Sequence, residues 1–169
     1  KIALGFLHVG MPVTIIRPEF VYGPHDMHLL SLFKVVRDKK FIFIGSGKNY
    51  VQPTYIDDLI EGLLLCLERN ETIGKVYILA GAKYVTIKEF IGEIANYFHI
   101  KPPKLHLPPL LARLLAVCFE ILAKAWPFEP PLTRSRVKFF TQNHFFDISR
   151  AKRDIGYNPK VSLGDGIKN

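Results

Sequence analysis

The stretch that most constrains this fold is residues 12–24, Pro-Val-Thr-Ile-Ile-Arg-Pro-Glu-Phe-Val-Tyr-Gly-Pro. Residues 13–16 are a short, largely β-branched run between two prolines, which predicts a strand covered on both faces in a parallel sheet. We expect the strand to break at Arg17-Pro18, because proline donates no ladder hydrogen bond and restricts the residue before it. The following loop lies at the carboxyl end of the strand, where open α/β sheets bind ligands. Residues 18–26 are therefore the first candidate site.

Helices and short strands alternate along the rest of the chain. Apolar residues at helical or continuous spacing predict helices over 27–37, 56–69, 86–98, 110–125 and 133–140, and strands over 41–44, 76–79 and 104–107. Thr86 and Glu89 have the spacing of a capping box. Asp57 lies in the first turn of its helix, where we expect its carboxylate to cap backbone amides. The strand–helix–strand order predicts an α/β fold.

The two ends of the chain carry further local signals. Residues 1–9 read as the end of a helix that Gly10 closes. Residues 145–148 predict a short strand, and Ser149 is expected to cap a small helix that ends at Gly156.

The net charge of +8 raises the question of a nucleic-acid partner. The basic residues are spread along the chain without an aromatic-interleaved motif, so we expect no nucleic acid to bind. The apolar run over residues 110–125 contains three charged residues, which argues against a membrane span. Peripheral membrane contact by this run stays open as an alternative.

The cysteines and histidines indicate no metal site. Cys66 and Cys118 lie far apart in apolar helical patterns, which predicts buried thiols in a reducing compartment and hence a cytoplasmic protein. His25 and His28 are close in sequence, but no carboxylate or cysteine set completes a cage around them.

Three segments together carry a family resemblance that runs over nearly the whole chain. Residues 17–24, Arg-Pro-Glu-Phe-Val-Tyr-Gly-Pro, resemble the RPxxVYGP segment of extended short-chain dehydrogenases, the NAD-dependent epimerase/dehydratase family. Residues 45–59 resemble the family segment that ends in a Val-Asp-Asp-like helix start. Residues 146–160, Phe-Asp-Ile-Ser-Arg-Ala-Lys-Arg-Asp-Ile-Gly-Tyr-Asn-Pro-Lys, are similar to its closing segment.

The resemblance implies an α/β fold, the C-terminal portion of a Rossmann-like parallel sheet with a small, mostly helical substrate-binding lobe. On this basis residues 1–83 are assigned to the NAD(P)-binding domain with interleaved lobe strands. Residues 84–169 are assigned mainly to the substrate-binding lobe and the closing segment. The chain would then be a C-terminal fragment of a longer protein.

The resemblance also implies NAD or NADP as the cofactor. It places the nicotinamide ring beside Pro18, Glu19, Phe20 and Val21, with Phe20 also a candidate substrate contact. Two further candidate substrate contacts come from the residues themselves: Gln52, a polar side chain before a proline, and Leu114, within the apolar run of residues 110–125. The family's Gly-rich pyrophosphate turn is absent from the sequence.

The family's catalytic tyrosine and lysine share a helix at Tyr-x-x-x-Lys spacing, where the lysine lowers the phenol pKa. Tyr84 with Lys88 and Tyr97 with Lys101 have this spacing, but neither pair is expected to share a helix face. We therefore expect no catalytic residue in this chain, the true pair lying upstream of Lys1, and we expect the chain alone to be inactive.

One departure from the family pattern bears on the substrate. Val51 stands about where sugar-nucleotide epimerases carry an arginine that grips the substrate diphosphate, and valine lacks the guanidinium fork. The resemblance therefore favours the 3β-hydroxysteroid and sterol-4α-carboxylate dehydrogenase branch, which implies oxidation of a secondary alcohol by hydride transfer. It also implies a small, apolar substrate and a homodimer of the intact protein.

Two other functions stay open at this point. One is a nucleotide-sugar epimerase or dehydratase, and the other is a redox-inactive binding or regulatory module on the same fold. For residues 110–125, between Pro108-Pro109 and Pro127, a lid over an apolar substrate and a plain core helix are both open.

Overall fold

The computed structural model describes residues 2–126, 128 and 130–169. The chain divides into two compact units: unit 1 comprises Lys1–Asp26, Gln52–Tyr84 and Phe145–Asn169, and unit 2 comprises Met27–Val51 and Val85–His144. Pro127, expected to fix one end of the apolar helix, lies outside the described residues. The assignment of residues 1–83 to cofactor and of 84–169 mainly to substrate stays a prediction, because the division by contacts does not show what either part binds.

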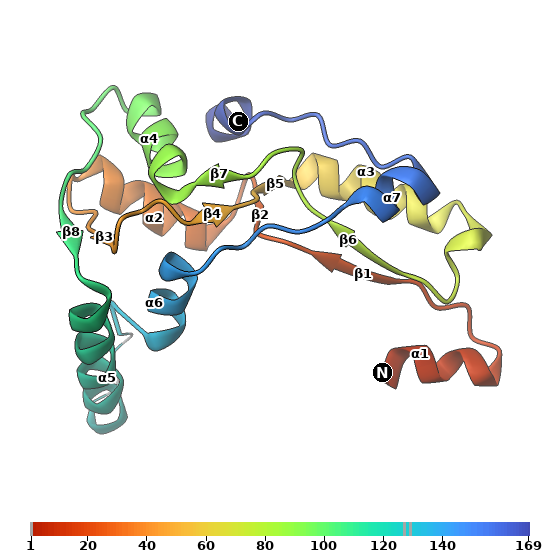
Figure 1. Ribbon diagram of the computed structural model, residues 1–169, viewed down its shortest axis with the longest axis horizontal. Coiled ribbons are helices and arrows are strands. Elements are labelled where there is room, and N and C mark those ends of the chain that lie inside the picture. The colour runs from red at the N-terminus through yellow and green to blue at the C-terminus, as the bar shows by residue number, and fades with distance from the viewer. Residues whose placement is uncertain (1, 127, 129) are drawn as a thin grey trace. The chain divides into compact units, whose positions relative to one another are not determined.

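Unit 1 is built on a parallel strand pair. β1 (Ile15–Pro18) runs beside β6 (Val76–Leu79), with Ile15 opposite Val76 and Pro18 opposite Leu79 (Figure 1). The predicted break before Pro18 is wrong. The N–H groups of Ile15 and Glu19 donate to the β6 side, so the alternation of a parallel ladder turns the proline nitrogen to the other edge, where no strand of the described chain pairs with β1.

A second, two-residue parallel pair continues unit 1, with β2 (Val21–Tyr22) beside β5 (Thr54–Tyr55). The helical elements of this unit are α1 (Ile2–Gly5), η1 (Phe6–Val9), α3 (Ile56–Leu67), η2 (Asn70–Thr72), α7 (Ser149–Ile155) and α8 (Leu163–Lys168). Gly10 closes η1 in the left-handed region at φ 80°, as predicted.

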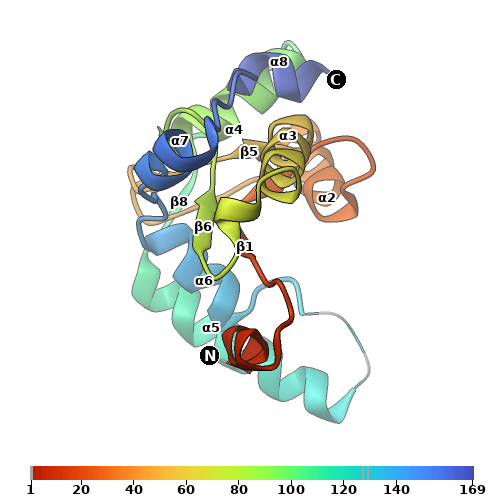
Figure 2. The same ribbon diagram turned by 90° about the vertical axis from the view of Figure 1, so that its right-hand side faces the viewer.

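The core of unit 1 lies on one face of the β1–β6 pair. Figure 2 shows α3 and α7 side by side over these strands. Their contacts bury one face of β6 together with the closing segment; the cluster includes Leu59, Cys66, Tyr77, Leu79, Ala151, Ile155 and Tyr157. The sequence pattern of β6 explains this, because alternate residues of a strand face the same side.

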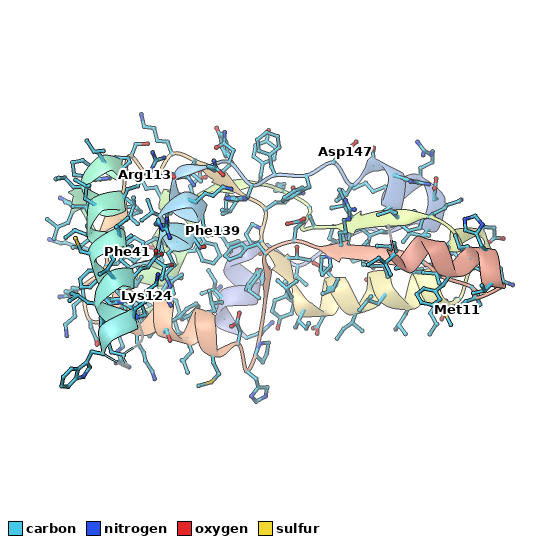
Figure 3. All side chains as sticks on the ribbon, turned by 90° about the horizontal axis from the view of Figure 1, so that it is seen from below. Met11, Phe41, Arg113, Lys124, Phe139 and Asp147 are labelled. Carbon is cyan, nitrogen blue, oxygen red and sulfur yellow. The ribbon has the colours of Figure 1, made fainter. Side chains whose placement is uncertain are left out.

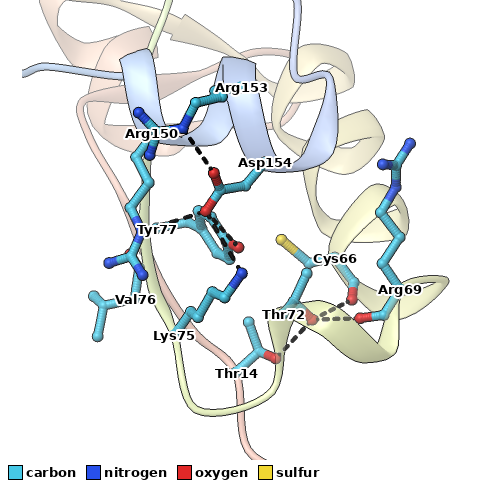
Figure 4. Close-up of polar contacts among 10 residues, drawn as sticks. All are labelled: Thr14, Cys66, Arg69, Thr72, Lys75, Val76, Tyr77, Arg150, Arg153 and Asp154. Carbon is cyan, nitrogen blue, oxygen red and sulfur yellow. Dashed lines mark hydrogen bonds and ion pairs between the residues drawn. The ribbon is translucent and has the colours of Figure 1, made fainter.

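Polar contacts fasten this core at two places (Figure 4). Asp154 on α7 meets the Tyr77 hydroxyl at 3.3 Å and Lys75 Nζ at 3.7 Å, and it also pairs with Arg153 at 3.1 Å. Partial burial acts to raise the pKa of Asp154, but the hydrogen bond and charge of Arg153 and the charge of Lys75 outweigh it and lower that pKa. The Thr72 hydroxyl bonds the Cys66 and Arg69 carbonyls and the Thr14 hydroxyl, which joins the end of α3 to the chain before β1.

The expected role of Asp57 is wrong. Its side chain is exposed, and the N-cap position of α3 is Tyr55, which makes no side-chain capping bond. The adjacent Asp58 is the buried carboxylate, at 3% exposure. It accepts the N–H groups of Lys160 and Val161 at 2.9 and 3.1 Å, so it holds the closing segment rather than its own helix.

Two further local expectations fail near the C-terminus. Residues 145–148 form no strand, and the Phe146 N–H donates to the Gln52 side chain instead of to a ladder. Ser149 is not the cap of α7: the carboxylate of Asp147 accepts both its N–H and its hydroxyl, at 2.8 and 2.9 Å. Gly156 does end α7 in the left-handed region, as predicted.

Unit 2 combines short strand pairs with four helices. β3 (Phe43–Ile44) is parallel to β8 (His106–Leu107), and β4 (Tyr50–Val51) is antiparallel to β7 (Val85–Thr86). The helices are α2 (Met27–Arg37), α4 (Ile87–Tyr97), α5 (Pro109–Ala125) and α6 (Arg134–Thr141). Parallel strand pairs joined through helices confirm the predicted α/β class.

Local signals in unit 2 agree with the sequence at two helices. The predicted capping box at Thr86 and Glu89 is formed in full. α5 packs Ala112 and Ala116 against Ile44 and Val137. Cys118 on the same helix is exposed, so the prediction of two buried thiols holds only for Cys66. Within the described part of the chain, no helix is both long enough and apolar enough to cross a membrane.

Candidate functional site

The first candidate site is the turn that follows β1 in unit 1. The Glu19 N–H donates to the Leu79 carbonyl at 3.1 Å, which continues the ladder by one residue. Thr54, which is fully buried, then binds both carbonyls of the turn: its hydroxyl donates to Glu19, and its N–H donates to Phe20 at 3.0 Å. The turn is therefore held from two neighbouring strands.

The turn has an uncommon backbone. Phe20 has φ of 36°, in the positive region that non-glycine residues rarely adopt. Strained residues of this kind persist where the surroundings fix them, and they gather at ligand sites. Pro18 is exposed, while Glu19, Phe20 and Val21 are half-buried. The four predicted cofactor residues thus run from the last residue of β1, through the turn at Glu19 and Phe20, to the first residue of β2.

Gln52, a predicted substrate contact, joins two segments of unit 1 by hydrogen bonds. It is 5% exposed. Its Nε2 donates to the Gly81 carbonyl at 2.7 Å and its Oε1 accepts the Phe146 N–H at 2.7 Å. The Nε2 group carries a second N–H that these bonds do not use. Contact with a substrate stays a prediction for this residue.

Gly81 and Thr54 were not singled out by the sequence analysis. A Cβ on Gly81 would overlap the Pro53 carbonyl oxygen, so only glycine allows β6 to continue past this segment. The signal available in the sequence was a glycine two residues after a buried strand. No pattern marked Thr54, because its role depends on strands that are far apart in the chain.

Two buried tyrosines lie near this end of unit 1. Tyr22 packs edge-on against Tyr55 at 5.5 Å, and the Tyr157 hydroxyl donates to the Ala80 carbonyl at 3.1 Å. Burial raises the pKa of both Tyr22 and Tyr157, and the nearby Asp58 carboxylate raises each further. A phenol with a raised pKa stays protonated at neutral pH. The ring contact of Tyr22 and the hydrogen bond of Tyr157 are contacts within the core of unit 1.

The remaining predicted substrate contact lies in unit 2. Leu114 is 56% exposed on α5, on a different side of the helix from the buried Ala112 and Ala116. Val51, which stands where sugar-nucleotide epimerases carry a diphosphate-binding arginine, is fully buried in β4. Phe20 and Gln52 belong to unit 1 and Leu114 belongs to unit 2. No contact within either unit therefore joins Leu114 to the other two residues.

The tyrosines of the two Tyr-x-x-x-Lys pairs lie in contact with other aromatic rings. Tyr97 ends α4 and packs its ring against Phe98 and Phe33, at 5.1 and 6.3 Å between centroids. Tyr84 is 58% exposed and stacks obliquely on Phe145.

A hollow in unit 1 lies along β1 before the turn. The residues that line it include Pro12, Thr14, Ile16, Leu63, Cys66 and Thr72, and none of the candidate site residues.

The comparisons with known proteins agree on the family. Residues 6–80 match the NAD dependent epimerase/dehydratase family. Over 94% of its length the chain is 29% identical to 3beta-hydroxysteroid-dehydrogenase/decarboxylase isoform 1 of Arabidopsis thaliana. Over 92% it is 30% identical to the human sterol-4-alpha-carboxylate 3-dehydrogenase, decarboxylating. The chain spans 39% and 44% of these two relatives, less than half of either.

A solved structure agrees as well. The UDP-glucuronic acid 4-epimerase of Bacillus cereus, in complex with UDP-glucuronic acid and NAD, is 26% identical with a TM-score of 0.68. The match covers 96% of this chain and 45% of that one. With the RPxxVYGP-like turn, the parallel strand pair that carries it and the packed closing segment, these similarities lead to one conclusion. The chain belongs to the NAD-dependent epimerase/dehydratase family.

Proposed function

We propose that the whole protein is an NAD(P)-dependent oxidoreductase that oxidises a secondary alcohol of an apolar, sterol-like substrate. The observation that carries this proposal is the similarity to two sterol-type dehydrogenases over more than nine-tenths of the chain. In such a reaction the carbinol carbon gives a hydride to the oxidised cofactor and the hydroxyl gives its proton to a base, which leaves a ketone. The base is not assigned within this chain.

The residues present fit one end of a nicotinamide cofactor. Pro18, Glu19, Phe20 and Val21 form a partly accessible segment whose backbone is fixed by hydrogen bonds to Leu79 and Thr54, at the place where the resemblance puts the carboxamide. A pyrophosphate needs a Gly-rich turn at a helix N-terminus, and the sequence has none. We therefore assign these four residues to positioning the nicotinamide, and the phosphate contacts to another part of the whole protein.

The substrate side rests on apolar chemistry. Position 51 holds a buried valine instead of an arginine, so no guanidinium is there to hold a diphosphate. Leu114 offers an exposed apolar side chain on unit 2, and Phe20 and Gln52 are the proposed contacts on unit 1. A homodimer of the whole protein and a cytoplasmic location stay predictions.

A second function is favoured by one specific observation. The structural match to a UDP-glucuronic acid 4-epimerase, solved with its sugar nucleotide and NAD, supports a nucleotide-sugar epimerase. The two functions differ in the ligand that the protein binds, so binding separates them.

The test measures binding of a 3β-hydroxysterol and of a UDP-sugar to the full-length protein, with and without Leu114→Asp. We expect sterol binding that Leu114→Asp weakens by about tenfold or more, because burying a leucine contributes about 1.5–3 kcal/mol. Leu67→Asp is the matched control, since Leu67 is 82% exposed on α3 of unit 1. Tight UDP-sugar binding without sterol binding would contradict the proposal and support the epimerase.

A further inference from the structure

One face of α5 is apolar and exposed along the length of the helix. Ala112 and Ala116 fill the side that packs on the core. Leu110, Val117 and Ile121, spaced by seven and four residues, share another side, and Leu110 and Ile121 are 69% and 60% exposed. We call these three residues the outer face of α5. An apolar stripe of this kind on a well-packed helix calls for a partner.

Two basic side chains border the outer face. Arg113 and Lys124 are eleven residues apart, which is three helical turns, and Figure 3 shows both along α5. Glu120, the one acidic residue of α5, is engaged by Arg134 at 2.7 Å. In the described part of the chain, neither Arg113 nor Lys124 makes an ion pair within 4.0 Å, and the charge of Lys124 acts on Glu120 only at longer range. One edge of the outer face is therefore positively charged, and the opposite edge continues into the exposed side chains of Leu114, Leu111 and Leu122.

The charge of the whole unit has the same sign. Unit 2 contains thirteen Lys and Arg against five Asp and Glu, whereas unit 1 contains ten of each. The entire formal charge of +8 therefore belongs to the unit that carries α5. A basic unit with an exposed apolar helix is complementary to a surface that is both anionic and apolar beneath.

Trp126 adds an independent observation. It follows the last residue of α5 and is 73% exposed. Tryptophan is enriched at the boundary between water and hydrocarbon, where its ring is buried and its N–H stays hydrogen-bonded.

We propose that the outer face of α5 docks unit 2 on an anionic lipid surface, with the helix lying in the plane of the headgroups. Leu110, Val117 and Ile121 enter the acyl boundary, while Arg113 and Lys124 extend along it to lipid phosphates. A second copy of the chain fits less well, because pairing two outer faces brings like charges together. A nucleic acid fits less well, because its phosphate backbone would not bury the apolar side chains of the outer face. Leu114, proposed above as a substrate contact, lies on this same side of α5, four residues after Leu110. The vesicle test below contains no sterol, so its outcome does not depend on the reaction proposed above.

The test uses the fluorescence of Trp126, the single tryptophan of the chain, with vesicles that contain no sterol. Vesicles of phosphatidylcholine with about 30% phosphatidylserine should shift its emission to the blue and sediment the protein. Pure phosphatidylcholine vesicles should do so much less, and raising the salt to about 0.5 M should release the protein. An equal response to neutral vesicles, or none to anionic ones, would overturn the proposal.

Variants locate the surface. Ile121→Asp should weaken vesicle binding by about tenfold or more, and Arg113→Gln with Lys124→Gln should weaken it on the order of 30-fold, as about 1 kcal/mol per basic residue implies. Leu67→Asp, on the neutral unit, should leave binding unchanged. Circular dichroism checks that each variant is folded. Unchanged binding by both α5 variants would exclude this face. A blue shift that grows with protein concentration in the absence of vesicles would indicate that a second copy covers the face. If RNA displaces the vesicles and the Ile121→Asp variant still binds RNA, the partner would be a nucleic acid. Either result would overturn the proposal.

Discussion

Asp58 shows how one buried carboxylate joins segments that are far apart in sequence. It lies in the first turn of α3, yet both of its oxygens accept backbone N–H groups of the closing segment. A buried acceptor that loses its partners, or buried N–H groups that lose their acceptor, cost the free energy of desolvation. The closing segment is therefore fixed by α3 as much as by its own helix.

Asp58→Asn should lower the free energy of unfolding by about 1–3 kcal/mol, because the amide nitrogen cannot accept one of the two N–H groups. Asp57→Asn is the matched control, and it should change stability by about 0.5 kcal/mol or less since Asp57 is exposed. Urea unfolding of the chain measures both. Equal effects of the two substitutions would contradict this assignment.

Gly81 is the second residue whose identity is fixed by contact. Gly81→Ala places a methyl group against the Pro53 carbonyl oxygen and should destabilise the chain by about 3 kcal/mol or more. Gly92→Ala should instead stabilise it by about 0.5–1 kcal/mol, because Gly92 lies within α4 with open space around it. Thermal unfolding of both variants checks the pair. A neutral Gly81→Ala would show that β6 does not pass Pro53 closely.

At the scale of elements, α4 is the helix that its sequence describes most fully. The Thr86 hydroxyl accepts the Glu89 N–H at 3.1 Å, and Glu89 in turn accepts the Thr86 N–H at 2.6 Å. The hydrogen bonds from the Thr86 backbone and side chain lower the pKa of Glu89 from its usual value of 4.5. The charged form of Glu89 therefore stabilises the folded chain.

This cap should depend on pH. Because the pKa of Glu89 is lower in the folded state, its stabilisation is complete above the usual value of 4.5 and is lost as the pH falls through the lowered value. Glu89→Gln should thus lower the melting temperature at pH 7 and have no effect at strongly acid pH. Glu93→Gln on the same helix is the control. A difference between wild type and Glu89→Gln that persists in acid would contradict the charge-based account.

Elements defined by local signals could be predicted, and those defined by partners could not. The capping box of α4, the bounds of α2 and the glycine ends at Gly10 and Gly156 follow from residues close in sequence. β1 was expected to stop before Pro18 because proline donates no ladder hydrogen bond. The sequence does not show that β6 pairs with the side of β1 that faces away from the proline nitrogen. The candidate turn was found by its position after a strand, whereas the hold of Thr54 on it depends on a long-range contact.

At the scale of the whole molecule, the two units differ in chemistry. Unit 1 carries the RPxxVYGP-like turn and no net charge, and unit 2 carries the exposed apolar helix and all of the excess positive charge. Composition alone gave the total charge but not its location, since each unit is assembled from separated segments. The overall charge therefore became informative only once the fold was known.

The central claim is that the whole protein oxidises an apolar secondary alcohol with a nicotinamide cofactor. The most direct test follows the absorbance of reduced cofactor as the full-length protein acts on a 3β-hydroxysterol with NAD or NADP, beside a UDP-sugar and beside the present chain alone. The account predicts sterol-dependent cofactor reduction by the full-length protein and no saturable dinucleotide binding by the chain alone, which lacks the Gly-rich phosphate turn. An epimerase returns the hydride to the sugar and leaves no net reduced cofactor, so conversion of the UDP-sugar is followed by analysing the sugar product. Epimerisation of the UDP-sugar without any sterol oxidation would contradict the account.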